Sequence, residues 1–213
     1  MKSPSTLKEK IRDALLAADL EKIARLSRHD KRVFSVLISL AYDKEDVLCW
    51  RAIEAMGKAA AVVAGEDPAS VRNIVRRLLW SLSDESGGMA WSAPEMLAEI
   101  VVNTPRLCAD IPPIILSLQE EEIFLKGVLW AMGRVIHSGI DVEGSRDIAF
   151  QSLGHEDPAV RGLALYVLSG DKSTGVTDRI KELAHDKGQF KIYRNHQLIE
   201  TTVGDAAKEA LRC

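Results

Sequence analysis

The chain has 213 residues, which is enough for one large or two small domains with a sizeable hydrophobic core. Its residues are 46% hydrophobic and 28% charged, a balance that excludes a disordered tail and a membrane protein. Aromatic residues make up only 5% of the chain, which favours helices because β-sheet cores depend on aromatic and β-branched side chains. The sequence therefore predicts an all-α protein.

The net charge of −3 is distributed unevenly along the chain. Residues 1–32 carry nine Lys/Arg against five Asp/Glu, whereas residues 84–122 carry one basic residue against eight acidic ones. The rest of the chain is neutral. This pattern excludes a uniformly basic surface for nucleic acid, and solvated faces are its simplest interpretation.

Signals for export, membrane insertion and disulfide formation do not appear in the sequence. No apolar run approaches the ~20 residues that span a bilayer, and "MKSPSTLKEK" contains no apolar segment typical of a secretion signal. Cys49, Cys108 and Cys213 are far apart and show neither a disulfide framework nor a zinc spacing. We therefore expect a cytoplasmic protein without a metal or a cofactor.

Helix-start signals recur along the chain. Thr6 and Glu9 have the spacing of a capping box, at the start of two short helices expected at about residues 5–18 and 19–28. The turns between predicted helices are short, so successive helices should be antiparallel neighbours. Cap residues followed by proline predict further helix starts at Asp67, Thr104 and Asp157.

Four segments of the chain can be aligned with one another: "CWRAIEAMGK" (49–58), "AWSAPEMLAE" (90–99), "LKGVLWAMGR" (125–134) and "VRGLALYVLS" (160–169). They recur at intervals of 41, 35 and 35 residues, and small residues fall where a helix must approach its neighbour closely. Each segment follows another amphipathic helix. The sequence therefore predicts helix–turn–helix repeats of about 35–40 residues, within the range of α-solenoids.

Residues 156–170 resemble the second helix of a HEAT-like, armadillo-type repeat, of the short kind also found in phycobilisome lyases. The residues that match the Asp-Pro, Val-Arg and spaced-alanine pattern are Asp157, Pro158, Val160, Arg161 and Ala164. In the other copies the arginine is replaced by Trp50, Trp91 or Lys126, and we expect the two tryptophans in the core between repeats. The resemblance covers roughly residues 30–185 as an architecture and supplies no catalytic residues that could be transferred to this chain.

The last part of the chain departs from the repeat. A strand-like run at 189–193 and a polar turn around Asn195 predict a β-hairpin. Thr202 and Asp205, at capping-box spacing, predict a final helix over 203–212. We expect this hairpin and helix to cap the apolar flank of the last repeat.

The predicted organisation is one HEAT-like domain, an α-α superhelix, over residues 1–213. Residues 1–30 would form N-terminal capping helices, residues 31–186 about four helix–turn–helix repeats, and residues 187–213 the C-terminal hairpin and helix cap.

Few residue groups have the spacing that catalysis or metal binding requires. The five histidines do not pair at helical spacing. The dyads His29–Asp30 and His185–Asp186 fall in apparent helix-end turns, where the helix dipole alone favours histidine. Cys49 lies on an apolar helix face and is interpreted as a core residue rather than a nucleophile. We therefore predict no catalytic residues and favour a protein that is not an enzyme.

The alignment also defines one face of each second helix, which would line the concave side of a solenoid. Polar residues on this face suggest that it meets solvent and binds a partner. Gly127 and Gly162 would open a shallow depression beside Trp130 and Leu165, which either anchor a partner or pack between repeats. The predicted partner-binding residues are Arg51, Glu54, Lys58, Glu95, Glu99, Trp130, Arg134, His137 and Leu165.

These features predict a non-catalytic scaffold that binds a protein or peptide segment. The resemblance to phycobilisome lyases leaves open a chaperone-like factor or a lyase that handles bilins or other tetrapyrroles. HEAT-like DNA glycosylases leave open a nucleic-acid-binding protein, for which Arg72, Arg76 and Arg77 form a basic stripe. Against that alternative, Glu95 and Glu99 on the predicted face would repel phosphates.

Overall fold

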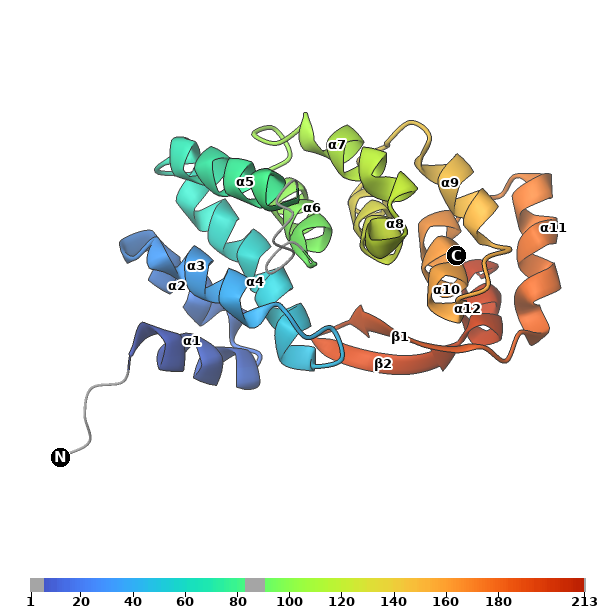
Figure 1. Ribbon diagram of the computed structural model, residues 1–213, viewed down its shortest axis with the longest axis horizontal. Coiled ribbons are helices and arrows are strands. Elements are labelled where there is room, and N and C mark those ends of the chain that lie inside the picture. The colour runs from blue at the N-terminus through green and yellow to red at the C-terminus, as the bar shows by residue number, and fades with distance from the viewer. Residues whose placement is uncertain (1–5, 83–90, 213) are drawn as a thin grey trace. The chain divides into compact units, whose positions relative to one another are not determined.

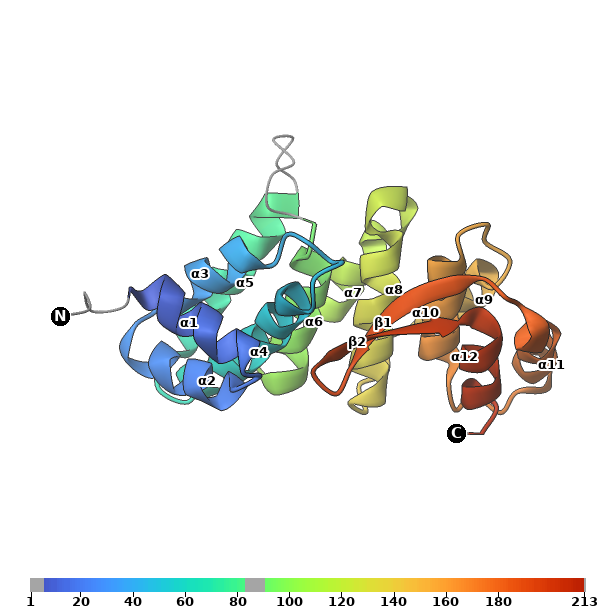
Figure 2. The same ribbon diagram turned by 90° about the horizontal axis from the view of Figure 1, so that it is seen from below.

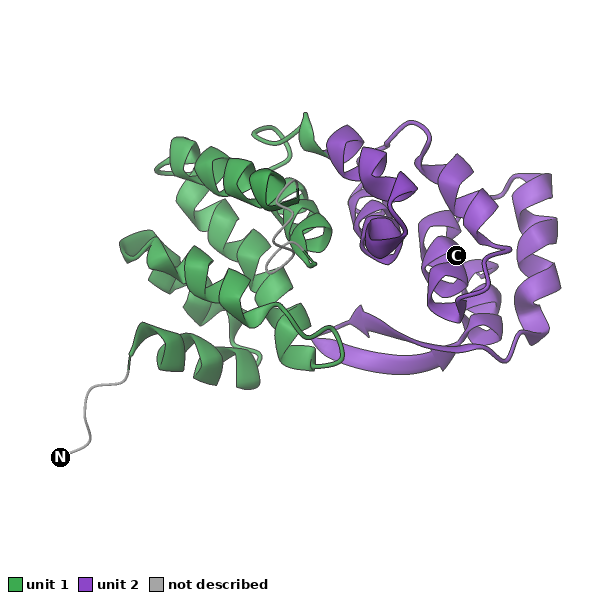
Figure 3. Ribbon diagram, in the orientation of Figure 1, with its two compact units in different colours: residues 1–111 green, residues 112–213 purple. Residues whose placement is uncertain are grey.

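The computed structural model of this chain describes residues 6–82 and 91–212, which are mainly helical (Figure 1). The chain divides into two compact units, residues 1–111 and residues 112–213 (Figure 3). Within the described residues, the one β-sheet is a two-stranded hairpin close to the C-terminus. The predicted all-α fold with a small C-terminal hairpin and helix is therefore confirmed.

Unit 1 begins with two short helices, α1 (Leu7–Leu16) and α2 (Leu20–His29), as the sequence predicts. The capping box is complete, because the Glu9 N–H donates to the Thr6 hydroxyl and the Thr6 N–H donates to the Glu9 carboxylate at 2.7 Å. Ala18 reverses the chain between the two helices with a left-handed φ of 53°.

The rest of unit 1 is built around one long helix. Its elements are α3 (Arg32–Leu40), α4 (Val47–Ala64), α5 (Pro68–Leu82) and α6 (Ala93–Asn103). Helix α4 packs against α2, α3 and α6, and its buried side chains come from nearly every turn. Removing these apolar side chains from water is the main source of stability for such a unit.

Unit 2 repeats this plan around a different central helix. The chain continues through α7 (Ile111–Ser117), a 3₁₀ turn (Leu118–Glu120), α8 (Glu122–His137), α9 (Ser145–Ser152), α10 (Pro158–Leu168), α11 (Thr174–Glu182), a second 3₁₀ turn (Leu183–His185), β1 (Gln189–Arg194), β2 (Gln197–Thr202) and α12 (Val203–Ala210). Helix α10 packs against α8, α9, β1 and α12 and is the centre of the unit. Asp157 caps α10 by accepting a hydrogen bond from the Ala159 N–H at 2.7 Å, as the Asp-Pro signal predicts.

The aligned segments fall on the helices that pack together within each unit, α4 against α6 and α8 against α10, except that Trp91 and Ser92 of the second segment precede α6 and its residue 90 lies outside the described residues. The glycine that ends both "EAMG" and "WAMG" explains the match. A Cβ on Gly57 would lie 2.5 Å from the Glu99 carbonyl oxygen of α6, and a Cβ on Gly133 would collide with the Tyr166 ring of α10. Each glycine therefore permits the close approach of the next helix, and the helical-repeat fold is confirmed.

The C-terminal hairpin and helix form as predicted (Figure 2). Arg194 pairs with Gln197 across a two-residue turn in which Asn195 and His196 have positive φ values of 50° and 61°. Two left-handed residues are typical of a type I′ turn, whose twist matches that of the two strands. Strand β1 packs on α10, where Gly162 leaves room for the Phe190 ring.

One predicted helix start is wrong. Thr104 ends helix α6 instead of beginning a helix, and the next helix begins at Ile111. The Thr104 hydroxyl is buried and donates to the Ile100 carbonyl oxygen at 2.7 Å, one turn back along α6. The Thr-Pro signal therefore falls at the end of α6, where the Thr104 side chain bonds back to its own helix, and residues 104–110 form bends and turns.

Candidate functional site

The predicted binding residues of α4 hold unit 1 together. The Arg51 guanidinium donates to the Leu15 and Leu16 carbonyl oxygens at the end of α1, both at 2.9 Å. The Lys58 ammonium pairs with the Glu21 carboxylate of α2 at 2.8 Å. Glu54 is half-buried on the same helix. Arg51 and Lys58 thus connect α4 to α1 and to α2, respectively.

The acidic residues of α6 are buried, so the expectation that they form a solvent-facing surface is wrong. Glu95 is 1% exposed, and its Oε1 atom lies 2.5 Å from the Lys44 ammonium. Its Oε2 atom has no hydrogen-bond partner among the described residues. Glu99 is 2% exposed and receives a hydrogen bond from Asn103. These carboxylates are interior groups of unit 1, and one of them forms an ion pair with Lys44, from the turn before α4.

Cys49 lies beside this interior group, 4.0 Å from the Ser92 hydroxyl. Burial raises the pKa of its thiol to about 12, because a thiolate would lose its hydration. The interpretation of Cys49 as a core residue is therefore confirmed. Cys108 is buried as well, whereas Cys213 lies outside the described residues.

The large apolar residues of the aligned segments differ in exposure, and not all of them lie where the alignment predicts. Trp130 and Leu165 are 3% and 1% exposed, so they pack inside the protein and neither can serve as a surface anchor. Trp50 is buried as expected, and its indole N–H donates to the Lys44 carbonyl oxygen at 2.8 Å. Trp91, in contrast, is 51% exposed, so its predicted place in the core is wrong.

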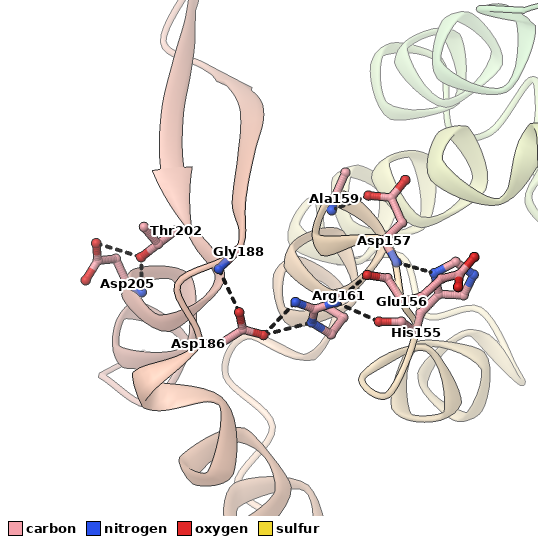
Figure 4. Close-up of polar contacts among 9 residues, drawn as sticks. All are labelled: His155, Glu156, Asp157, Ala159, Arg161, Asp186, Gly188, Thr202 and Asp205. Carbon is pink, nitrogen blue, oxygen red and sulfur yellow. Dashed lines mark hydrogen bonds and ion pairs between the residues drawn. The ribbon is translucent and has the colours of Figure 1, made fainter.

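Arg161, one of the residues that match the HEAT-like pattern, has a structural role (Figure 4). Its guanidinium donates to the His155 and Glu156 carbonyl oxygens at 2.7 and 2.8 Å. It also donates to the Asp186 carboxylate at 2.8 Å, and Asp186 in turn accepts the Gly188 N–H. Arg161 thus joins the turn before α10 to the turn before the hairpin.

Both His-Asp dyads lie at helix ends, as predicted. His29 is the last residue of α2, and the Asp30 that follows accepts two hydrogen bonds from the Arg32 guanidinium, which lower the pKa of that carboxyl. His185 ends the second 3₁₀ turn, and Asp186 binds Arg161. Over residues 6–82 and 91–212, no group of three His, Cys, Asp or Glu side chains could hold a metal ion.

His137, one of the predicted binding residues, contacts an aromatic and charged group in unit 2, and Arg134 lies three residues before it on α8. The His137 ring stacks on the Tyr166 ring with centroids 4.7 Å apart and planes inclined by 21°. The Arg194 guanidinium, from the end of β1, lies over the same ring with its Cζ atom 5.5 Å from the centroid. Glu209 of α12 pairs with Arg194 at 2.5 Å. We name these four residues, His137, Tyr166, Arg194 and Glu209, the Tyr166 cluster.

Contacts within unit 2 determine the positions of the Tyr166 cluster residues. Gly133 allows the Tyr166 ring to lie against α8, and the His137 Nδ1 atom is 2.7 Å from the Gly133 carbonyl oxygen one turn back. His137 is exposed, while Tyr166 and Arg194 are half-buried. Arg134 is half-buried on the same face of α8, three residues before His137. The cluster therefore offers one negative and several positive or aromatic groups on ordered elements.

Sequence reasoning missed Tyr166, Arg194 and Glu209. The signal available for Tyr166 was the "WAMG" glycine, because a helical glycine that is not at a turn indicates close approach of a neighbour. No local pattern indicates Arg194 or Glu209, since the hairpin brings them to α10 from a distant part of the sequence.

The basic stripe predicted on α5 is largely used within unit 1. Arg72 binds the Asp110 carboxylate through two guanidinium nitrogens at 2.7 and 2.8 Å and thereby lowers the pKa of that carboxyl. Arg77 donates to the Ser35 hydroxyl at 2.9 Å, and Arg76 is exposed. Two of the three arginines thus stabilise the fold, which weakens the interpretation of α5 as a nucleic-acid surface.

Comparisons with known proteins show what the chain is similar to. No protein-family model matches it. A protein of Archaeoglobus fulgidus, named as uncharacterized, is 29% identical over 181 residues, which cover 82% of this chain and 93% of that protein. Among solved structures, a designed armadillo repeat protein has a TM-score of 0.48 at 16% identity, covering 99% of this chain and 95% of its own. An engineered protein has a TM-score of 0.44 at 15% identity, covering 98% and 96%. None of the described helices has both the length and the hydropathy to cross a membrane.

Proposed function

We propose that the protein is a non-catalytic scaffold that binds a protein or peptide segment, and that unit 2 contacts this segment through the Tyr166 cluster. The observation that carries the proposal is the ring stack of exposed His137 on Tyr166, with Arg194 over the same ring. Tyrosine and arginine contribute strongly to binding energy at protein interfaces. Side chains held in place before binding lose little entropy when a partner arrives.

The proposal keeps part of the face predicted from the sequence. Arg134 and His137 remain accessible on the last turns of α8, whereas Trp130 and Leu165 are interior. The binding face therefore begins one turn beyond the position of Trp130. We also keep the expectation that the protein works in the cytoplasm.

Selection of a phage-displayed random-peptide library on the immobilised full chain tests this proposal. Peptides enriched by the wild type should bind the His137→Ala variant about tenfold more weakly, because the truncation removes half of the ring stack. His29→Ala is the matched control, since His29 is also an exposed histidine in the last turn of a helix. Peptides that bind both variants equally well, or no enrichment at all, would contradict the proposal.

A further inference from the structure

One face of helix α5 is exposed and carries charged and aromatic side chains. Its residues are spaced by three or four positions, so they lie side by side along the helix. They are Asn73, Arg76, Arg77 and Trp80. The buried residues Val71, Val75 and Leu78 lie on the opposite side of the helix, which packs into the core of unit 1. We name the four exposed residues the α5 outer face.

The two arginines of this face form no ion pair with a carboxylate of the described residues. Arg77 donates to the Ser35 hydroxyl of α3 at 2.9 Å, which is a neutral acceptor. The sequences of α3 (RVFSVLISL) and α5 (PASVRNIVRRLLWSL) contain no aspartate or glutamate. Neither Arg76 nor Arg77 lies in the last turn of α5, where the helix dipole would favour a cation. The face therefore keeps both positive charges available to a partner.

Trp80 adds an exposed aromatic ring beside these charges. It is 70% exposed, more than any other of the four tryptophans in the chain. It follows Arg76 by four residues and Arg77 by three, spacings at which side chains on a helix are neighbours. Tryptophan and arginine are enriched among the residues that contribute most to binding energy at protein interfaces. The α5 outer face thus combines an apolar ring with two guanidinium groups.

We infer that the α5 outer face is a second binding surface, in unit 1, and that its partner is an acidic peptide segment with an apolar side chain beside its carboxylates. A guanidinium can bind a carboxylate through two parallel N–H donors, and the indole ring offers apolar surface to the neighbouring side chain. A basic segment would meet two like charges and be repelled. The inference goes beyond the proposed function, because the Tyr166 cluster lies in unit 2 and shares no residue with this face.

The short extent of the charged surface favours a peptide over a nucleic-acid strand. The affinity of a protein for nucleic acid grows with the number of phosphates that its cations neutralise. Arg72, four residues before Arg76, is already bound to the Asp110 carboxylate, which is itself 56% exposed. A strand that runs along α5 would therefore meet a negative charge directly beyond the two arginines. A peptide needs to supply only a few carboxylates and one apolar side chain.

Titration of the full ¹⁵N-labelled chain with an acetylated peptide of repeating Glu-Glu-Leu tests the inference, and a peptide of repeating Gln-Gln-Leu is the uncharged comparison. We expect the acidic peptide to shift the indole N–H signal of Trp80, which the Trp80→Ala variant identifies. The uncharged peptide should bind about tenfold more weakly, because it offers no carboxylate to the arginines. The His137→Ala variant should bind the acidic peptide as the wild type does, so this inference and the proposed function can fail independently.

A double variant tests the charge of the face. Arg76→Gln combined with Arg77→Gln should weaken binding of the acidic peptide about tenfold. The matched control is Arg12→Gln combined with Arg25→Gln, because these arginines are also exposed, on α1 and α2 of the same unit. The control removes the same net charge and should change the affinity less than about twofold, since distant exposed charges are screened by salt. Circular dichroism checks that each variant keeps its helix content.

Trp80→Ala should also weaken the binding about five- to tenfold, whereas Trp91→Ala, at the other exposed tryptophan, should not. Equal affinities of the wild type and either the Arg76/Arg77 double variant or Trp80→Ala would overturn the inference. Equal affinities for the charged and uncharged peptides would overturn it as well. Tighter binding of single-stranded oligothymidylate than of the acidic peptide, weakened by the same variants, would make the face a nucleic-acid surface and refute the peptide partner.

Discussion

Replacing Arg161 with leucine should destabilise unit 2 by about 2–4 kcal/mol. Arg161 and Asp186 are 16% and 19% exposed, so their ion pair is largely withdrawn from water. The arginine also satisfies the His155 and Glu156 carbonyl oxygens. Leucine keeps much of the apolar stem but removes every one of these hydrogen bonds.

The magnitude follows from what the substitution leaves behind. Removing one partner of a fully buried ion pair costs about 3–5 kcal/mol, because the other charge stays without compensation. Asp186 retains the hydrogen bond from the Gly188 N–H at 2.8 Å, and its partial exposure admits water. Both effects reduce the cost below that of a fully buried pair. Asp186→Asn should cost less than Arg161→Leu, since the amide oxygen can still accept the Gly188 N–H.

Urea unfolding followed by circular dichroism measures the overall loss, and hydrogen exchange of the amides of α10, β1 and α12 shows whether the loss falls on unit 2. Arg179→Leu is the control, because its pair with Glu182 is 42% and 61% exposed and contributes at most about 1 kcal/mol. If Arg161→Leu costs no more than Arg179→Leu, the role of Arg161 as the tie between the two turns is refuted.

Four further substitutions or treatments test the packing and the electrostatics. Gly133→Ala should destabilise by about 1–3 kcal/mol through its collision with the Tyr166 ring, whereas Gly175→Ala, with open space around it, should not; thermal unfolding compares the two. Trp130→Ala should cost about 3–5 kcal/mol in urea unfolding, as expected for a buried tryptophan and not for a surface anchor. The Cys49 thiol, with a pKa of about 12, should react with iodoacetamide at pH 8 only after unfolding, as mass spectrometry would show. The pKa of Asp110 is lowered by its hydrogen bonds to Arg72, so this pair stabilises the fold above the unfolded-state pKa and its contribution is lost as the pH falls through the folded-state pKa. Asp110→Asn should therefore lower the unfolding midpoint at pH 7, and its effect should shrink as the pH falls through the folded-state pKa of Asp110.

Local signals predicted the helix ends well where the cap and its partner are close in sequence. Thr6 with Glu9, and Thr202 with Asp205, form the expected hydrogen bonds because a helix start needs residues within one turn of each other. Thr104 shows the limit of such signals. A Thr-Pro pair can stand at a helix start or directly after a helix end, and here the Thr104 hydroxyl donates to the Ile100 carbonyl oxygen of the helix that precedes it.

The charge of a residue was a poor guide to its exposure. Glu95 looks like a surface residue in the sequence, yet it is interior because Lys44, from the turn before α4, reaches its carboxylate. That pairing joins residues 51 positions apart, so no window of local sequence contains it. Trp91 fails in the opposite direction, since an apolar side chain at a repeat position is left exposed.

The glycine position shared by two copies of the repeat leads to the Tyr166 cluster, whereas several of the predicted binding residues are buried. Gly57 and Gly133 occupy the same position in two copies, and each permits the next helix to come close. Against Gly57 the neighbours are the Glu99 carbonyl group and the Asn103 side-chain amide of α6, whereas against Gly133 the neighbour is the Tyr166 ring of α10. The His137 ring stacks on the Tyr166 ring, and the Arg194 guanidinium also lies over it. A glycine at the same repeat position therefore permits close helix packing in both units, but only in unit 2 does it place an aromatic ring beside charged side chains.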